Sequence, residues 1–508
     1  MLINCTPYLF DFNAISNLDT EIMEIFRKST EILEKFPEIC ECVDFDLDRH
    51  ALKKKELRLS VKKYNEEQTN GKDYLFDCCE IKIGTAILLE SGRPRLRTEL
   101  VVFFMILRGL WSSISDHRAA ETFKDSLSIN SVLAYYNYKI PGINTIRENV
   151  NAISNSTRRL IMKSQAMLIL MKGLDDFSEV YIDSTDTAAN TSYPTDVSIL
   201  YKLIDRTYRS FLLLENEFDF PCLGDGWLNK RLKNMNGHLA FISMNVGKRG
   251  VKGKVKESFK AFAVLAQNCI NSFFEEQERL TVNWETSQLS PDKGIALDAL
   301  WYKIDEDLHD ALYVLYYAEL LVHENIKLPS REKILSISDC DAAYIQKGQR
   351  YPTIGYKPQI ARSGNGFICG YLLPSGNTAD SEMLVPTVLN VYQTTDIMPL
   401  LVSTDDGYAS EKAVRTLKEE CRIPTVSING SKGKKITMED WDTTSYAEAR
   451  RKRSAVESGM FTLKYRHGFG RMRRRGIEAV KAEQLEKVIA YNFIHMIRKE
   501  KAALKNAA

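Results

Sequence analysis

The order in which strands and helices are expected along the chain constrains the fold more than any other feature. A short apolar strand, Val180-Tyr-Ile-Asp183, precedes a mostly helical stretch of about residues 197–330, and further strands follow only after it. We expect those strands at 333–338, 354–360, 367–373, 400–405 and 425–428, with helices at 381–392 and 410–420. Alternating strands and helices favour an α/β fold, here with a large helical insertion after the first strand.

Two of these strands end on an acid. Without the helical stretch, the element order resembles that of ribonuclease-H-like folds, in which the first strand and the strand at 400–405 are parallel neighbours. Asp183 ends one and Asp405 ends the other, so we expect their carboxylates at the same sheet edge, about 4.8 Å apart in the pairing direction. Asp406 is the alternative if the second strand ends one residue later.

A third acid, Glu457, lies in an expected helix over residues 451–464. At about 100° per residue, Arg453, Glu457 and Lys464 fall within about 40° of one another on one face. A solvated helix with an ordinary Arg–Glu pair is one interpretation. The other is that Glu457 joins the two aspartates, and that two Mg²⁺ ions, or Mn²⁺ as the alternative, relieve the repulsion among the three carboxylates.

The segments around these acids resemble those of DDE-type transposases of bacterial insertion sequences. Asp405-Asp-Gly-Tyr408 matches the family's pattern after its second aspartate, and Lys333-Ile-Leu-Ser-Ile337 resembles one of its middle strands. The triplet Arg453, Glu457 and Lys464 matches the family's helix signature in identity and spacing. Arg450 is a departure, because the family carries tyrosine there. The insertion before the second aspartate is a further departure, since many relatives insert after it.

The resemblance covers about residues 90–500 and implies an enzyme that binds element ends, cleaves DNA phosphodiesters and joins 3′-hydroxyl ends to target DNA. Asp183, Asp405 and Glu457 would be its catalytic residues and the ligands of two Mg²⁺ ions. Its partner would be double-stranded DNA, and we expect a homodimer when two ends are paired. Two alternatives stay open: a domesticated, non-catalytic DNA-binding protein, and a related metal-dependent DNA nuclease.

A local excess of positive charge surrounds Glu457. Residues 430–475 contain thirteen Lys and Arg against five acids, a surplus of eight in a chain whose formal net charge is +2. Such a surface would bind phosphates and make DNA affinity salt-dependent. The candidate DNA-binding residues are Arg450, Arg453, Lys464, Arg471, Arg473, Arg474, Arg475, Lys432, Lys434 and Lys435.

The chain length of 508 residues favours several domains. We expect an N-terminal helical region at 1–90, a helical, helix-turn-helix-like DNA-binding domain at 91–175, a catalytic domain at 176–475 and a C-terminal helix at 476–508. A generic helical bundle is the alternative for 91–175. The sequence has no signal-like start, no apolar run of 18 residues and only ten cysteines, which predicts a cytosolic protein without a membrane partner. The resemblance implies that this is the bacterial cytosol and that the protein is associated with the nucleoid.

Overall fold

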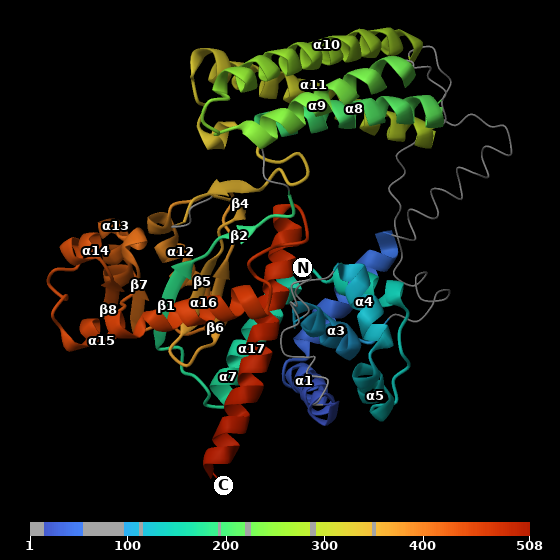
Figure 1. Cartoon of the computed structure of the whole chain (residues 1–508). Coiled ribbons are helices and arrows are strands. Elements are labelled where there is room, and N and C mark those ends of the chain that lie inside the picture. The colour runs from blue at the N-terminus through green and yellow to red at the C-terminus, as the bar shows by residue number, and fades with distance from the viewer. Residues whose placement is uncertain are drawn as a thin grey trace. The chain divides into compact units, whose positions relative to one another are not determined.

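A computed structural model describes residues 15–53, 96–110, 115–191, 195–218, 225–284, 291–347 and 352–507. The chain divides into two compact units, one of Met1–Asn190 with Ile345–Ala508 and one of Thr191–Tyr344 (Figure 1). Over the described ranges, no helix combines the length and the apolar character needed to cross a bilayer.

The first unit contains a five-stranded mixed sheet in the order β6-β5-β1-β7-β8. Its strands are β1 (Glu179–Ser184), β5 (Gln359–Ser363), β6 (Ile368–Leu372), β7 (Leu401–Thr404) and β8 (Thr425–Ile428). The β6-β5-β1 half is antiparallel, whereas β1, β7 and β8 run parallel. This mixed α/β arrangement is consistent with a ribonuclease-H-like fold.

Helices pack against this sheet because its strands are apolar along most of their length. The covering helices are α12 (Asp380–Thr395) on β5 and β6, α15 (Thr444–Lys452) on β7 and β8, α16 (Ser454–Arg466) on β1, and α17 (Ile477–Ala507) on β6. Shorter elements complete this part: β2 (Thr187–Ala188), which pairs with β4 (Thr353–Tyr356), then η4 (Asp406–Tyr408), α13 (Glu411–Arg415), η5 (Thr416–Glu420) and α14 (Ser431–Ile436). The strand β3 spans Ala343–Ile345.

The N-terminal part of the first unit is helical. It comprises α1 (Ile15–Lys35), a helix over 38–53, α3 (Thr98–Leu110), α4 (Asp116–Asp125), α5 (Leu127–Tyr135), α6 (Ile143–Ala152) and α7 (Asn155–Met171). Both α3 and α7 pack on α17. A Cβ added at Gly109 would lie 2.2 Å from the Glu486 carbonyl oxygen, so the close approach of α3 to α17 requires glycine there.

The second unit is a helical bundle with its own hydrophobic core. It contains α8 (Asp196–Phe218), α9 (Asp225–Asn245), α10 (Lys252–Trp284), α11 (Pro291–Glu319), a π-helical turn η2 (Leu320–Glu324) and a short 3₁₀ turn η3 (Ser330–Glu332). Arg206 of α8 donates to the fully buried Asp307 of α11, with Nε 2.7 Å from Oδ2. This pair satisfies a fully buried acid of the helical unit.

The structure corrects several predicted elements. The predicted strand at 333–338 is wrong, because the chain there is an irregular segment after η3. Ser336 Oγ accepts from the backbone N–H groups of Ser338 and Asp339, and such local bonds compete with a strand ladder. The predicted strand at 354–360 is two strands, interrupted at Lys357-Pro358, because proline cannot donate to the ladder.

Two predicted helices are also divided. The sequence predicts one helix over residues 146–171, after the break at Pro141-Gly142. The structure has two there, α6 and α7, because Ser154 caps the start of α7 by accepting from the Thr157 N–H. The helix at 451–464 is interrupted at Arg453, where α15 passes into α16. The boundary expected at residue 90 lies outside the described residues.

Candidate active site

The sheet brings Asp183 and Asp405 together. Tyr181 pairs with Ser403 in the parallel β1–β7 ladder, so the residues two positions further on each strand, Asp183 and Asp405, lie at the same edge. Burial raises the pKa of the Asp405 carboxyl, and the nearby charge of Asp183 raises it further. Because the charge of Asp183 disfavours ionisation of Asp405, a bound cation would stabilise the charged form of Asp405.

A lysine already contacts this pair. Lys347 Nζ donates to Asp183 Oδ1 at 2.9 Å, to Ser184 Oγ at 2.7 Å and to the Ser184 carbonyl oxygen. Its positive charge also lowers the pKa of Asp405. Sequence reasoning missed Lys347, because it lies 164 positions from Asp183 and belongs to no motif quoted above.

The neighbouring Asp406 faces elsewhere. Its Oδ1 accepts from the backbone N–H groups of Lys432 and Gly433, at 2.9 Å and 2.8 Å, and so caps the start of α14. Gly430 has a φ of 121°, and a Cβ there would lie 2.5 Å from the Asp406 side chain. This geometry favours Asp405 over Asp406 as the acid beside Asp183.

A fourth acid, Asp380, lies close to the site. A Cβ added at Gly407 would meet both Asp405 Oδ1, at 3.1 Å, and Asp380 Oδ2, at 3.6 Å. Burial alone would raise the pKa of Asp380, but hydrogen bonds from Gln359 and Lys357 lower it. Asp380 stands in the first turn of α12, a position that the sequence also offers as an ordinary helix-start acid.

Glu457 lies on the exposed side of α16. Its side chain is 59% exposed, and its Oε1 lies 2.7 Å from Arg453 Nη2. This is the ordinary i,i+4 ion pair that the interpretation as a solvated helix predicts. Within the described ranges, no group of three His, Cys, Asp or Glu side chains could hold a metal ion, so the structure brings together the two aspartates but not all three acids. The role of Glu457 stays a prediction.

Lys464 and Arg450 also contact other side chains. Lys464 Nζ donates to Asp186 Oδ1 at 2.7 Å, and Thr353 Oγ1 donates to Asp186 Oδ2 at 2.8 Å. Arg450, at the position where the family carries tyrosine, stacks its guanidinium 4.0 Å from the centroid of the Trp441 ring. The guanidinium of Arg450 is therefore held against an aromatic face.

The remaining candidate DNA-binding residues divide into exposed and engaged ones. The exposed side chains are those of Lys432, Lys434, Lys435, Arg471 and Arg475. Among them, Arg475 Nε also donates to the Asn190 carbonyl oxygen at 3.2 Å. Arg473 is half-buried, and burial lowers its pKa. Arg474 Nη2 lies 3.2 Å from Asp116 Oδ2, and its Nη1 lies 3.3 Å from Glu486 Oε1. The guanidinium of Arg474 is thus directed into the protein, where it contacts acids rather than solvent.

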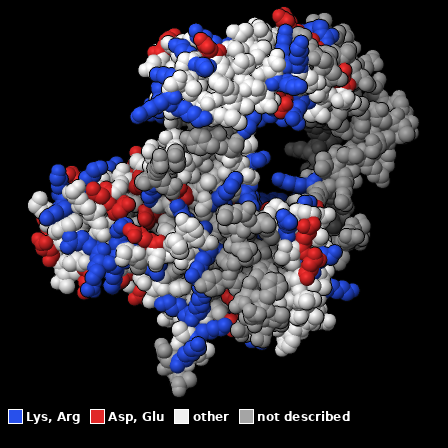
Figure 2. All heavy atoms as spheres, viewed as in Figure 1, with Lys and Arg blue, Asp and Glu red and all other residues white. Residues whose placement is uncertain are grey.

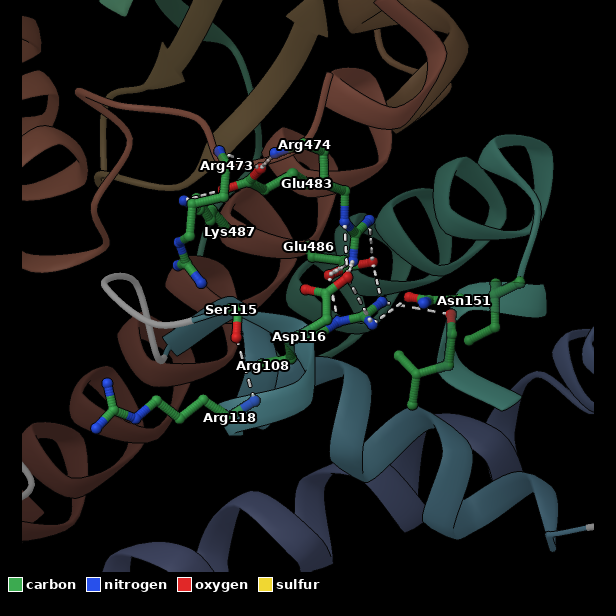
Figure 3. Close-up of polar contacts among 12 residues, drawn as sticks. Arg108, Ser115, Asp116, Arg118, Asn151, Arg473, Arg474, Glu483, Glu486 and Lys487 are labelled. Carbon is green, nitrogen blue, oxygen red and sulfur yellow. Dashed lines mark hydrogen bonds and ion pairs between the residues drawn. The ribbon is translucent and has the colours of Figure 1, made fainter. Parts of the chain in front are cut away.

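Figure 3 shows the buried cluster of charged side chains that Arg474 contacts. Glu486 of α17 is 2% exposed, and its carboxylate accepts from Arg108 of α3 and Arg158 of α7, each at 2.7 Å. Burial would raise the pKa of Glu486, but the surrounding arginines hold it far below its ordinary value. No sequence pattern pointed to this cluster, because its members come from segments that lie far apart along the chain.

Comparison with known proteins identifies part of the chain. Residues 337–493 match the family model described as "Transposase DDE domain". Asp405 and Glu457 lie inside the matched segment, and Asp183 lies before it. No curated protein and no solved structure matches the chain significantly. The matched domain supports a transposase function, so the resemblance to DDE-type transposases predicted from the sequence is confirmed, and this chain carries a transposase DDE domain over residues 337–493.

Proposed function

We propose that this protein is a transposase that cleaves DNA phosphodiesters at the ends of a mobile element and joins the 3′-hydroxyl ends to target DNA. The observation that carries the proposal is the pair of acids, Asp183 and Asp405, at one edge of a mixed sheet whose order β6-β5-β1-β7-β8 agrees with a ribonuclease-H-like fold. The family match over residues 337–493 supports it independently.

The donor set of this site fits a divalent cation. Mg²⁺ binds oxygen ligands, keeps several waters and needs only one or two carboxylates from the protein. Asp183 and Asp405 supply two such carboxylates, and their mutual repulsion, seen in the raised pKa of Asp405, is relieved by positive charge. Bound Mg²⁺ or Mn²⁺ would supply charge stabilisation and an activated nucleophile for phosphodiester chemistry.

We propose Glu457 as the third ligand, on the grounds of its spacing from Arg453 and Lys464. It stands on α16, the helix that packs on β1, and its partner Arg453 is close enough to Asp405 to lower the pKa of that carboxyl. Exchange of the Arg453–Glu457 pair for a metal contact would free the Arg453 guanidinium to bind a DNA phosphate.

The basic side chains around the site would hold the DNA. Lys432, Lys434 and Lys435 are exposed on α14, directly after the strand β8 that neighbours β7. We also propose that the helices within 91–175 bind element ends, that a homodimer forms when two ends are paired, and that the protein acts at the nucleoid in the bacterial cytosol. The proposal for 91–175 depends on the family resemblance.

The test uses the full chain and a plasmid carrying the DNA that flanks its gene on both sides. With Mg²⁺, we expect cleavage at the element boundaries and joined products in a second plasmid, and EDTA should stop both. Asp183→Asn, Asp405→Asn and Glu457→Gln should each reduce cleavage by at least about 10²-fold, as expected when a group that stabilises transition-state charge is lost. DNA binding should persist.

Other outcomes separate the alternatives. Cleavage without any joined product would favour a metal-dependent nuclease, and binding without cleavage by the unaltered chain would favour a domesticated DNA-binding protein. Unchanged cleavage by Glu457→Gln, beside loss of cleavage by Asp405→Asn, would remove Glu457 from the proposed ligand set and leave the two aspartates in it.

A further inference from the structure

A strongly basic segment lies in the helical unit, outside the site described above. Residues 246–260, here called the basic turn, connect α9 to α10 and include the first turns of α10. They carry six Lys and Arg against one acid, Glu257, a net charge of +5 in a chain of net +2. The basic residues are Lys248, Arg249, Lys252, Lys254, Lys256 and Lys260, and all six are exposed.

These cations differ from those at the active site, because no carboxylate neutralises them. In the part of the chain that the structure describes, none of the six forms an ion pair, and Lys248 Nζ meets only the amide oxygen of Asn245, at 3.3 Å. By contrast, Lys347, Arg453 and Lys464 each contact an acid. The basic turn therefore presents its full charge to solvent.

The positive charge of the basic turn lies at the start of α10, where it disfavours the helix. The first turn of α10 contains no acid, although the partial positive charge of a helix N-terminus favours acids and disfavours cations. Lys252 and Lys254 stand there instead, and they also repel Arg249. A bound anion would relieve both the unfavourable charge at the helix N-terminus and the repulsion among the cations. The residues that destabilise the unbound helical unit would therefore stabilise its complex with an anion.

The backbone of the turn is accessible as well. Gly247 and Gly250 have φ values of 84° and 82°, which favour glycine, and a Cβ added at either would meet no atom within 4 Å. Figure 2 shows Lys and Arg side chains projecting from the end of the helical unit where α9 passes into α10. A polyanion could thus approach the turn without displacing protein side chains.

We infer that the basic turn is a second DNA-binding surface, which holds the phosphate backbone of duplex DNA without reading its sequence. Five of the six cations are lysines, which act as point charges on flexible stems, whereas base recognition usually uses arginine, asparagine or glutamine in bidentate geometry. The choice of DNA as the polyanion rests on the proposed function. The inference gives the helical insertion a role: it extends the DNA contact beyond the catalytic sheet.

The test compares two double variants of the full chain. Arg249→Gln with Lys252→Gln removes two charges from the basic turn, and Arg209→Gln with Lys303→Gln removes one arginine and one lysine from exposed positions elsewhere in the same unit. Binding to a random-sequence duplex is measured by fluorescence anisotropy over a series of NaCl concentrations. We expect the slope of log K against log salt to fall by about 1.8 in the first variant, two contacts at about 0.9 each.

The control should keep the slope of the unaltered chain, and the first variant should lose affinity equally for random and flanking DNA. An unchanged slope in the first variant would overturn the inference, as would a loss confined to RNA or to an acidic polypeptide. The outcome is distinguishable from failure of the proposed function: a chain that never cleaves DNA, but whose slope falls in the first variant, would retain the basic turn as a DNA-binding surface.

Discussion

Lys347 Nζ lies 2.9 Å from Asp183 Oδ1, and also binds both oxygens of Ser184, so an ammonium group neutralises the acid that we propose as a metal ligand. The lysine and a divalent cation would compete for the same carboxylate. The metal-free and metal-bound forms of the site would therefore differ in where this lysine lies.

We expect Lys347→Met to bind Mg²⁺ about tenfold more tightly, since removing one competing ion pair worth about 1.4 kcal/mol changes an equilibrium constant tenfold. Isothermal titration calorimetry with Mg²⁺ or Mn²⁺ measures this directly. Lys452→Met is the matched control, because Lys452 forms a similar ion pair with Glu179, at 2.8 Å, away from the two aspartates. Equal Mg²⁺ affinity in all three proteins would show that Lys347 does not compete with the metal.

Asp405→Asn should stabilise the metal-free protein at pH 7. The raised pKa of Asp405 means that its favourable contribution is present below the unfolded value of 3.8 and is lost as pH rises through the folded pKa. Removing the charge should increase the unfolding free energy by on the order of 1 kcal/mol, about 2–4 °C in Tm. The gain should shrink as pH falls through the folded pKa of Asp405, because the native carboxyl then takes up a proton.

The neighbouring acid is the control for this measurement. Asp406→Ala should lower Tm at pH 7, because the Asp406 carboxylate accepts two backbone N–H bonds at the start of α14, and loss of such a cap costs about 1 kcal/mol. Opposite signs at adjacent positions would be hard to explain by a general effect of removing negative charge. Stabilisation by both substitutions would contradict the assignment of Asp405 as the repelled acid.

Glu486→Gln should destabilise the first unit strongly. It would leave the buried guanidinium groups of Arg108 and Arg158 without their anion, and breaking a buried pair costs about 3–5 kcal/mol. Urea unfolding followed by circular dichroism checks this. Glu478→Gln on the same helix removes an acid that is 70% exposed and paired with Lys481, so a loss of less than about 0.5 kcal/mol is expected there. A similar loss of unfolding free energy in both variants would contradict the role of Glu486 as the anion that neutralises Arg108 and Arg158.

His467 should make the protein sensitive to mild acid. Burial lowers its pKa to about 4, and the charges of Arg498, Lys487 and Arg466 contribute. The unfolded chain therefore binds a proton that the native protein does not between about pH 6.5 and 4, and stability falls across this window by about 1.4 kcal/mol per pH unit. His467→Phe keeps an aromatic ring against Tyr491. Between pH 7 and 4.5, the unfolding free energy of this variant should fall by about 2–3 kcal/mol less than that of the unaltered chain.

The comparison uses urea unfolding at the two pH values. His117→Phe serves as the control, because the His117 side chain is 52% exposed and its loss should leave the difference between the two pH values unchanged. If His467→Phe shows the same acid sensitivity as the unaltered chain, other buried groups are responsible.

The sequence predicted those features that local pattern determines. The strand at 425–428 was found with its bounds, and the first strand differs by one residue at each end. Ser115 caps α4 as expected, since its Oγ accepts from the Arg118 N–H. The meeting of Asp183 with Asp405 was also predictable, because parallel strands that start in register end in register.

The partners of these residues were not predictable from one sequence. Lys464 contacts Asp186, which lies 278 positions away in the sequence, and Glu486 contacts arginines that lie up to 378 positions away. Such contacts depend on the path of the whole chain, which neither helical periodicity nor strand alternation specifies. The predicted strand at 333–338 failed for a local reason, because its serines bond to their own backbone.

The pairing of β2 with β4 has a consequence for how this protein can change over evolutionary time. Ala188 pairs with Gly355 in this antiparallel ladder, which belongs to the small sheet β2-β4-β3, so this pairing holds the two ends of the insertion together whatever lies between them. Loop-closure entropy grows slowly, by about 0.6 kcal/mol for each doubling of length. The distance along the chain from Asp183 to Asp405 can therefore change with the length of the inserted helices, while the strands β1 and β7 keep the two carboxylates at the same sheet edge.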